Sequence, residues 1–360
     1  MQPQQQPLNP PAATSGDSLS VAEVDASARV AWDAFVTSNN GSFYHLFDWK
    51  DVNERSLGHH CEYLAARDSL GAIQGILPLV FVKSRLFGRI LCSMPFMNYG
   101  GPVAASPQAA DALTRAAQAR AQALGADYLE LRCPAPLETS MPVSLRKVSM
   151  TVPLMADPEA LFNSFSQKHR KNIRRAQKNE LTVRKGGIDL LDDFFHILEL
   201  SWRSLGTPMY SKGYFKHLLE TFPQNTAVFT CSWKGAPVAA TLVGHFNGVV
   251  EGMWAGARQE LRHLDANYVL YWEMLRDACQ AGHKVFHLGR STSQSGAEQF
   301  KSKWNAETHQ LYWYFHRPDG GPMPQLNVDN PKYQLAIAAW RKLPLWATRV
   351  VGPPIARLIP

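Results

Sequence analysis

Hydrophobic and polar positions predict a strand-strand-helix-strand unit in the first half of the chain. Apolar stretches at 73–82 and 89–94 predict two strands, and a polar-apolar periodic segment at 106–125 predicts a helix. This helix begins with Ser-Pro and ends at a glycine, which are typical residues of helix boundaries. The stretch 127–132 then predicts a third strand directly after the helix.

The second half repeats the same order of elements. Strands are predicted at 237–246 and 249–256, a helix at 265–281 ended by Gly282, and a strand at 284–288. Helix-glycine-strand units also recur by chance in α/β proteins, which is the alternative interpretation. The shared order favours a duplication. We therefore expect an α/β (α+β) protein of two tandem domains, each a mixed and mostly antiparallel sheet flanked by helices.

Composition divides the chain into four segments. We expect a disordered tail at 1–20, a first domain at 21–150, a second domain at 151–315 and a proline-interrupted tail at 316–360. The first twenty residues are rich in Gln, Pro and Ser and lack the basic and apolar regions of a signal peptide. No stretch reaches the roughly 18 apolar residues of a membrane span, so we expect a soluble, cytoplasmic protein.

A mostly helical bridge at 158–222 opens the second domain and carries the densest charge. Its first predicted helix, 158–179, has a buried apolar stripe and one basic face. The net charge of the chain is +7. The basic face predicts an anion-binding surface for the phosphates of a tRNA or the diphosphate of a nucleotide- or lipid-linked sugar. The alternatives are a solvated face that aids solubility, or direct RNA binding. The basic residues are Lys168, Lys171, Arg174, Arg175 and Lys178.

Several classes of site are disfavoured by the sequence. The five cysteines are odd in number and scattered, which predicts reduced thiols and neither a disulfide framework nor a metal site. No motif for ATP, NAD, serine hydrolase or zinc protease chemistry is present. The Q/R-x-x-G-x-G/A pattern that binds the pyrophosphate of coenzyme A is not clearly present either. Coenzyme A is therefore a less favoured ligand, although the sequence does not exclude it.

The second half also carries the candidate chemistry. A loop rich in glycine and hydroxyl groups follows the strand 284–288 and suits contact with an acyl or phosphate group. Lys301 follows this loop, close enough in sequence to reach the same cleft. An exposed surface lysine is the alternative for Lys301. The candidate substrate-binding residues are Phe300, Ser291, Asn267 and Tyr271, with Asn98 and Tyr99 from the first half, where a plain hairpin turn is the alternative.

Six stretches of the chain resemble the FemAB family, within the branch that accompanies exosortase and exopolysaccharide loci. Their order and spacing agree over roughly residues 30–315. The stretches are LPLVFVKSRLFG (77–88), SMPFMNYGGP (93–102), HRKNIRRAQKN (169–179), SLGTP (204–208), ANYVLYWEML (266–275) and FHLGRSTSQSGAEQFKSKW (286–304).

This resemblance implies two GNAT-like domains and transfer of an acyl or aminoacyl group onto an amine, which forms an amide bond. It implies no tightly bound cofactor, but an activated donor, aminoacyl-tRNA or acyl-CoA, as co-substrate. The acceptor would be a nucleotide- or lipid-linked glycan or peptide precursor of the cell envelope or of an exopolysaccharide. Lys301 matches the family's lysine that is thought to stabilise the transition state. With that chemistry, either Lys301 or Arg290 would stabilise the oxyanion that forms when an amine attacks an ester or thioester, a contribution of about 3–4 kcal/mol in oxyanion holes.

Two positions depart from the family pattern. His287 stands where relatives commonly have Asp, and Asn305 where they often have Gly. A histidine can serve as a base near neutral pH, but it can equally be a core residue. These departures keep a second interpretation open, namely a non-catalytic GNAT-fold binding or scaffold protein in polysaccharide assembly.

The C-terminal stretch 332–360 is apolar, basic and interrupted by prolines. It combines Trp340 and Trp346 with several arginines and lysines. This mixture is typical of a segment that rests on an anionic membrane surface, which would place the protein peripherally at the inner membrane. The alternative is a short helix that packs back onto the domains.

Overall fold

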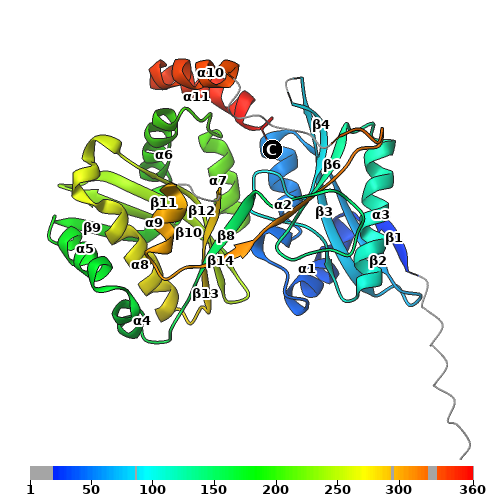
Figure 1. Ribbon diagram of the computed structural model, residues 1–360, viewed down its shortest axis with the longest axis horizontal. Coiled ribbons are helices and arrows are strands. Elements are labelled where there is room, and N and C mark those ends of the chain that lie inside the picture. Colours follow the sequence, from blue (N-terminus) through cyan, green and yellow to red (C-terminus); the bar gives the residue numbers. More distant parts are fainter. Residues whose placement is uncertain (1–18, 86, 293–295, 323–330, 360) are drawn as a thin grey trace, which may run out of the picture.

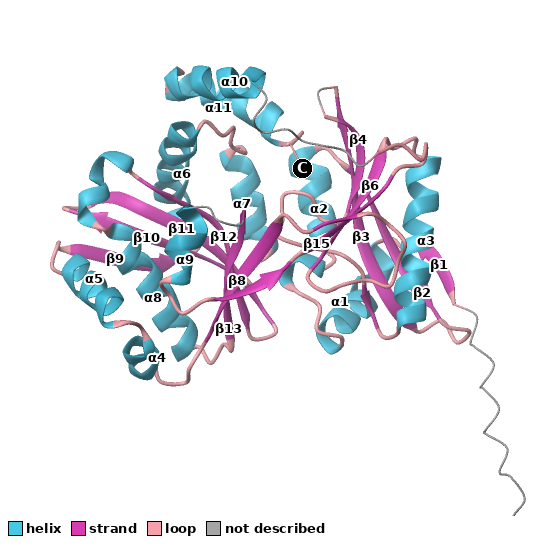
Figure 2. Cartoon of the chain, in the orientation of Figure 1, coloured by secondary structure: helices cyan, strands magenta, loops and turns pink. Residues whose placement is uncertain are grey.

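The chain folds into two halves that lie side by side, each built on one sheet with helices against it (Figures 1 and 2). The computed structural model describes residues 19–85, 87–292, 296–322 and 331–359. Both sheets are mixed, with one parallel pair in each among the described strands and antiparallel pairs elsewhere. The expected tandem α/β architecture is therefore confirmed.

The sheet of the first half has the order β1-β2-β3-β4-β6-β15-β7, and β5 pairs with β3. Its strands are β1 (Ser20–Glu23), β2 (His60–Arg67), β3 (Ile73–Ser84), β4 (Gly88–Cys92), β5 (Val103–Ala104), β6 (Tyr128–Cys133), β7 (Val143–Ser144) and β15 (Tyr312–His316). Its helices are α1 (Arg29–Ser38), α2 (Trp49–Asp51) and α3 (Pro107–Ala123).

The sheet of the second half has the order β14-β8-β13-β12-β11-β10-β9. Its strands are β8 (Lys147–Pro153), β9 (Leu181–Gly186), β10 (Thr226–Trp233), β11 (Ala236–Phe246), β12 (Val249–Ala257), β13 (Val285–Thr292) and β14 (Glu307–Gln310). The helices after β8 are α4 (Pro158–Ser164), α5 (Gln167–Gln177), α6 (Leu191–Leu205), α7 (Lys212–Thr221), α8 (Ala266–Gln280), α9 (Gly296–Ser302), α10 (Pro331–Lys342) and α11 (Leu345–Ala356).

The boundary residues of the two repeated helices behave as their sequence predicts. The Ser106 side chain accepts a hydrogen bond from the Ala109 amide at the start of α3. Gly125 and Gly282 follow α3 and α8 with φ angles of +63° and +76°, a left-handed conformation that glycine adopts without steric cost. Each helix therefore ends where the next strand of its sheet must begin.

One predicted helix is wrong in its extent. The segment 158–179 forms two helices, α4 and α5, because Phe165 is extended and the Ser166 side chain caps a new helix by accepting from the His169 amide. Residues on both sides of the break, Leu161 and Ile173 among them, are nevertheless buried as the stripe predicts. The predicted basic residues all belong to α5 or to its C-cap.

The two halves exchange strands across the expected domain boundaries. Residue 150 falls inside β8, which pairs with β13 and β14 in the second sheet. Most of β15 falls inside the expected second domain, yet it pairs with β6 in the first sheet. The chain therefore crosses between the two sheets twice, which ties them together.

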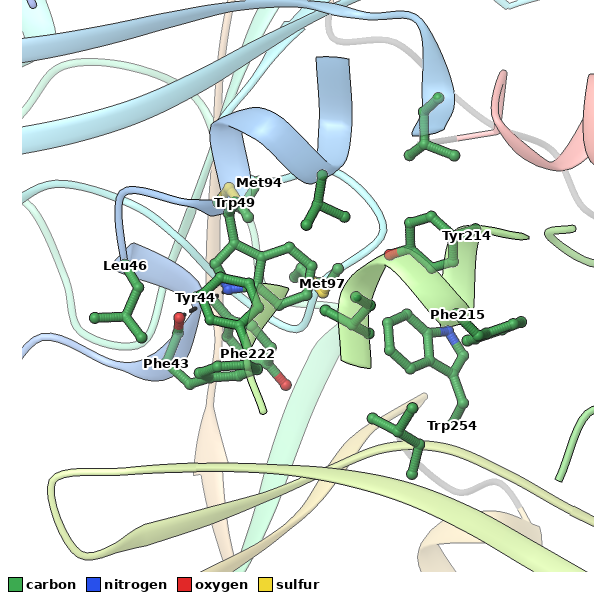
Figure 3. Packing of buried hydrophobic residues seen from close by; sticks show 14 of the residues in the cluster. Phe43, Tyr44, Leu46, Trp49, Met94, Met97, Tyr214, Phe215, Phe222 and Trp254 are labelled. Carbon is green, nitrogen blue, oxygen red and sulfur yellow. Dashed lines mark hydrogen bonds between the residues drawn. The ribbon is translucent and has the colours of Figure 1, made fainter. Parts of the chain in front are cut away.

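An aromatic cluster also joins the halves. Phe43 and Trp49 of the first half pack against Phe222 of the second at ring distances of 5.0 and 5.2 Å. Trp254 on β12 and Phe215 on α7 extend the same cluster, as Figure 3 shows. The junction between the halves is therefore a continuous hydrophobic core.

Candidate active site

A cleft opens where two neighbouring strands of the second sheet separate. β12 and β13 pair in parallel from Val249↔Val285 to Glu251↔His287, and this pairing then ends although both strands continue. The facing edges beyond this point border a cavity of about 380 Å³. Residues Gly252–Ala255 of β12 and Leu288–Arg290 of β13 line its wall.

The first half contains the same divergence, but there the gap is filled. β4 and β6 pair in parallel from Ile90↔Tyr128 to Cys92↔Glu130 before they separate. The chain after β4 then closes the gap, because the amides of Gly100 and Gly101 donate to the Arg132 carbonyl oxygen at 3.0 and 2.8 Å. Of the two equivalent gaps, only the one between β12 and β13 in the second half is open.

Lys301 lies in the wall of the cleft and is 9% exposed. Its Nζ donates to the carbonyl oxygens of Gly289 at 3.0 Å and Arg290 at 2.9 Å, and to Ser291 Oγ at 3.0 Å. Three acceptors around one ammonium match its three protons. Burial, with a contribution from Arg290, lowers the pKa of Lys301 to about 8. Lys301 thus holds the separated end of β13 and places a positive charge at the cleft.

Arg290 joins the cleft to the first half. Its backbone amide donates to Asn98 Oδ1 at 3.3 Å and its guanidinium to the Met97 carbonyl oxygen at 3.2 Å. The same guanidinium lies 5.4 Å from the ring centre of Trp313, which also contacts the buried Arg132 at 4.3 Å. Burial and the nearby Arg132 lower the pKa of Arg290 to about 10. Arg290 therefore remains a cation at neutral pH.

A buried carboxylate lies next to the cleft at the junction of the halves. Glu251, 1% exposed, accepts hydrogen bonds from Tyr44 at 3.2 Å and from Tyr99. His287 Nδ1 lies 3.3 Å from Glu251 and accepts from the Gly289 amide at 3.0 Å. Burial lowers the pKa of His287, which is therefore neutral near pH 7. The cluster links strands β12 and β13 to the first half through Tyr44, whose hydroxyl also accepts from Asn98 Nδ2 at 3.0 Å.

A second cavity, of about 210 Å³, lies at the start of α8. Asn267 and Phe300 line it together with Arg258 and Arg262. Because Phe300 faces this cavity and the adjacent Lys301 faces the cleft, α9 forms a wall shared by the two.

Helix α5 lies beside this second cavity. Arg175 pairs with Asp265 at the N-cap of α8, and Asn172 donates to the hydroxyl of Tyr268 at 3.4 Å. Lys168, Lys171 and Lys178 are exposed to solvent. The basic face thus lies next to the start of α8, where helix N-terminal amides favour an anion.

The structure brings together part of the predicted site. Four candidates, Lys301, Arg290, Tyr271 and Asn98, line the cleft, and Ser291 contacts Lys301. Asn267 and Phe300 line the neighbouring cavity instead. Tyr99 does not line the cleft; it is buried against Glu251 and borders another cavity of about 430 Å³ at the junction.

Two residues of the site were not identified in the sequence. Glu251 is the one acid in the apolar strand 249–257, a pattern that signals a buried carboxylate with a function or a fixed partner. Tyr44 lies in a short helical turn far away in sequence, and no local pattern points to its contact with Glu251.

Within the described ranges, no group of three or more His, Cys, Asp or Glu side chains could hold a metal ion. Over the same residues, no helix has the length and apolar character that crossing a bilayer requires.

Residues 164–302 match the family model described as "Acetyltransferase (GNAT) domain". This segment contains β12, β13 and Lys301, which form part of the cleft wall. Two GNAT-like domains in tandem make up this fold. No curated protein matches the chain in sequence.

Solved structures of similar fold extend over most of the chain. A crystal structure of FemX is 14% identical, covers 88% of this chain and 100% of its own, and has a TM-score of 0.65. The C-terminal domain of a putative lysylphosphatidylglycerol synthetase from Agrobacterium fabrum is 11% identical, with coverages of 87% and 96% and a TM-score of 0.56. A tandem GNAT protein from the clavulanic acid biosynthesis pathway is 11% identical, with coverages of 85% and 100% and a TM-score of 0.50. At these identities the likeness concerns the fold.

Proposed function

We propose that the chain transfers an acyl or aminoacyl group onto an amine of a cell-envelope or exopolysaccharide precursor. The observation that carries the proposal is Lys301, a buried cation in the wall of an open cleft between separated strands. The GNAT match over the same segment supports acyl transfer as the class of reaction. FemX and the lysylphosphatidylglycerol synthetase, among the similar structures, support an envelope acceptor.

In this reaction a C–N bond forms and the C–O or C–S bond of the donor breaks. Negative charge develops on the carbonyl oxygen, and fixed donors and cations at that point lower the barrier. Lys301 and Arg290 supply positive charge, and the edge of β12 that no longer pairs with β13 lines the same cleft. The leaving oxygen or sulfur departs with the electron pair and is protonated. The amine loses one proton, and it requires no protein base when it arrives neutral.

The positions of the cavities suggest where the donor binds. Its phosphates would lie against α5 and the start of α8, beside the cavity lined by Asn267 and Phe300. Its acyl group would then pass α9 and reach Lys301. Aminoacyl-tRNA and acyl-CoA both carry phosphates next to an activated acyl group, and the length of the basic face favours the tRNA.

The acceptor would enter where the first half meets the cleft, near Asn98. The resemblance to the exosortase-associated FemAB branch favours an exopolysaccharide precursor, linked to a nucleotide or a lipid. A peripheral position at the inner membrane surface suits a lipid-linked acceptor.

Replacing Lys301 by Met tests the transferase function. We expect kcat to fall about 100-fold or more, the size of effect known for removal of one electrostatic contact to a transition state. Circular dichroism and donor binding must stay unchanged for this result to count, because the variant also loses the three hydrogen bonds of Lys301. The exposed Lys303, two residues away, provides a matched control, and Lys303→Met should retain activity. Because the pKa of Lys301 is about 8, turnover of the unmodified chain should decline above that pH as Lys301 loses its proton.

Equal activity of the two lysine variants would remove Lys301 from the mechanism. A chain that binds donor and acceptor but shows no turnover with any activated acyl donor would instead support the second candidate, a non-catalytic scaffold in polysaccharide assembly. The closed gap of the first half shows that this architecture also exists in a form without an open cleft.

A further inference from the structure

Helix α11 places its small residues against the protein and its large apolar residues in solvent. Thr348, Gly352 and Ala356, spaced by four, are buried, and a Cβ at Gly352 would lie 3.2 Å from the Met209 carbonyl oxygen. On the outer face, Trp346 and Val350 are 70% and 68% exposed. A helix that only packs on a core buries its large apolar side chains, so this distribution is inverted.

The neighbouring helix α10 adds to the outer face. Leu335 is 72% exposed, whereas Trp340 is buried. The hairpin is held firmly, because Arg349 donates two hydrogen bonds of 2.6 Å to the buried Glu199 on α6. Large apolar residues scattered singly on a surface need no explanation, but Leu335, Trp346, Val350, Val351 and Ile359 all belong to this one segment.

The charge of the hairpin has one sign. Residues 331–360 contain five basic residues and no acidic residue. Arg349 is neutralised by Glu199, while Arg341, Lys342 and Arg357 are exposed. An exposed tryptophan and aliphatic residues among basic side chains match the chemistry of an anionic lipid surface, with its acyl chains and negative headgroups.

The hairpin also borders the cleft. Ala356 and Ile359 line the cavity that contains Lys301. The end of the chain reaches the first half, where His59 Nε2 donates to the Arg357 carbonyl oxygen at 2.7 Å. Figure 1 shows α10 and α11 lying over the second half, with the C-terminus near the junction.

We propose that the outer face of α10 and α11 docks onto an anionic lipid surface and brings the mouth of the cleft to that surface. The docking follows from the exposed residues and their charge alone. The further consequence, that the acceptor is carried by a lipid, rests on the proposed transferase function.

Co-sedimentation of the full chain with vesicles tests the docking. We expect binding to vesicles rich in phosphatidylglycerol, weak binding to pure phosphatidylcholine, and weaker binding at high salt. The double variant Trp346→Ala, Val350→Ala should lower the affinity about tenfold or more. Arg341→Gln with Lys342→Gln should lower it about fivefold for each charge.

The control is a pair of apolar residues elsewhere that are even more exposed than Trp346 and Val350. Val30 and Leu70 are 81% and 93% exposed in the first half, and Val30→Ala with Leu70→Ala should leave vesicle binding unchanged. An equal loss in both double variants would overturn the proposal. A second outcome would also overturn it: the chain binds no vesicles but forms a concentration-dependent dimer, and the double variant Trp346→Ala, Val350→Ala abolishes this dimer. In that case a second copy of the chain would cover this face.

Activity separates this proposal from the transferase function. Turnover on a water-soluble acceptor without any vesicle binding would overturn the docking and leave the transferase function standing. Vesicle binding by a chain without turnover would support the docking and count against the transferase function.

Discussion

His169 is a buried histidine for which neither ring nitrogen has a hydrogen-bond partner within the described residues. It packs among Phe165, Tyr268 and Trp304, the last at 4.3 Å between ring centres. Burial, with a smaller contribution from Lys303, lowers the pKa of His169 to about 4. The native state therefore keeps this histidine neutral, whereas the unfolded chain protonates it near pH 6.5.

This difference makes stability depend on pH. Between about pH 4 and 6.5 the unfolded state binds more protons, so the free energy of unfolding falls as the pH falls through this window. At pH 5 the loss from His169 is about 2 kcal/mol relative to pH 7. We expect His169→Phe to reduce the pH 7 to pH 5 difference by that amount in urea unfolding experiments.

The exposed His263 provides the control, because His263→Phe makes the same replacement at a position in solvent. Part of the dependence should persist in His169→Phe, because burial also lowers the pKa of His45 to about 4. A His169→Phe chain with the same pH dependence as the unmodified chain would contradict this account.

At the residue scale, the candidate residues that the structure joins are those that are close together along the chain. Arg290, Ser291 and Lys301 lie in one stretch, and the structure joins them through the Lys301 ammonium. Contacts between the halves were not predictable in the same way. Asn98 and Tyr99 are adjacent in sequence, but Asn98 lines the cleft and Tyr99 lines another cavity.

Among the elements, α5 carries the most exposed charge of one sign. Its three exposed lysines, Lys168, Lys171 and Lys178, lie beside the start of α8. If they contact the phosphates of a tRNA, the affinity will fall steeply with salt. Replacing all three by Gln should weaken tRNA binding and reduce the slope of log K against log salt by about 0.7–1 for each lost contact.

A matched variant separates this local effect from net charge. Lys83, Lys216 and Lys234 are also exposed, and changing them to Gln removes the same charge from other surfaces. This control variant should retain most of the tRNA affinity and most of the slope of log K against log salt. Equal losses in both triple variants would show a non-specific effect of charge, and no tRNA binding at low salt would exclude a tRNA-linked donor.

The element scale also shows why helix boundaries were predicted unevenly. The ends of α3 and α8 depend on local residues, the serine cap of α3 and the glycines that follow both helices. The break between α4 and α5 depends on Ser166, whose capping hydrogen bond competes with a continuous helix. The four-residue spacing of the apolar positions continues through the break between α4 and α5. This spacing alone therefore predicted a single helix.

For the whole molecule, the duplicated order of elements predicted the tandem architecture, whereas the exchange of strands was not predictable. β15 follows the second repeat in sequence but pairs with β6, next to the parallel pair of the first sheet. Trp313 on β15 then lies between Arg132 of the first repeat and Arg290 of the second. Such pairing between distant segments depends on tertiary contacts, which leave no periodic pattern in the sequence.

The crossed chain and the shared core predict that both halves unfold together. The first sheet needs β15 to cover the edge of β6, and Glu251 of the second half is the hydrogen-bond partner of Tyr44 and Tyr99 in the first. Two domains of this size often unfold in separate steps. Here we expect one transition in urea, with coincident curves from tryptophan fluorescence and far-ultraviolet circular dichroism.

A fragment ending at residue 146 should fail to fold, because it lacks β15 and leaves the edge of β6 open. Two resolved transitions, or a stable folded fragment, would show that the halves are independent.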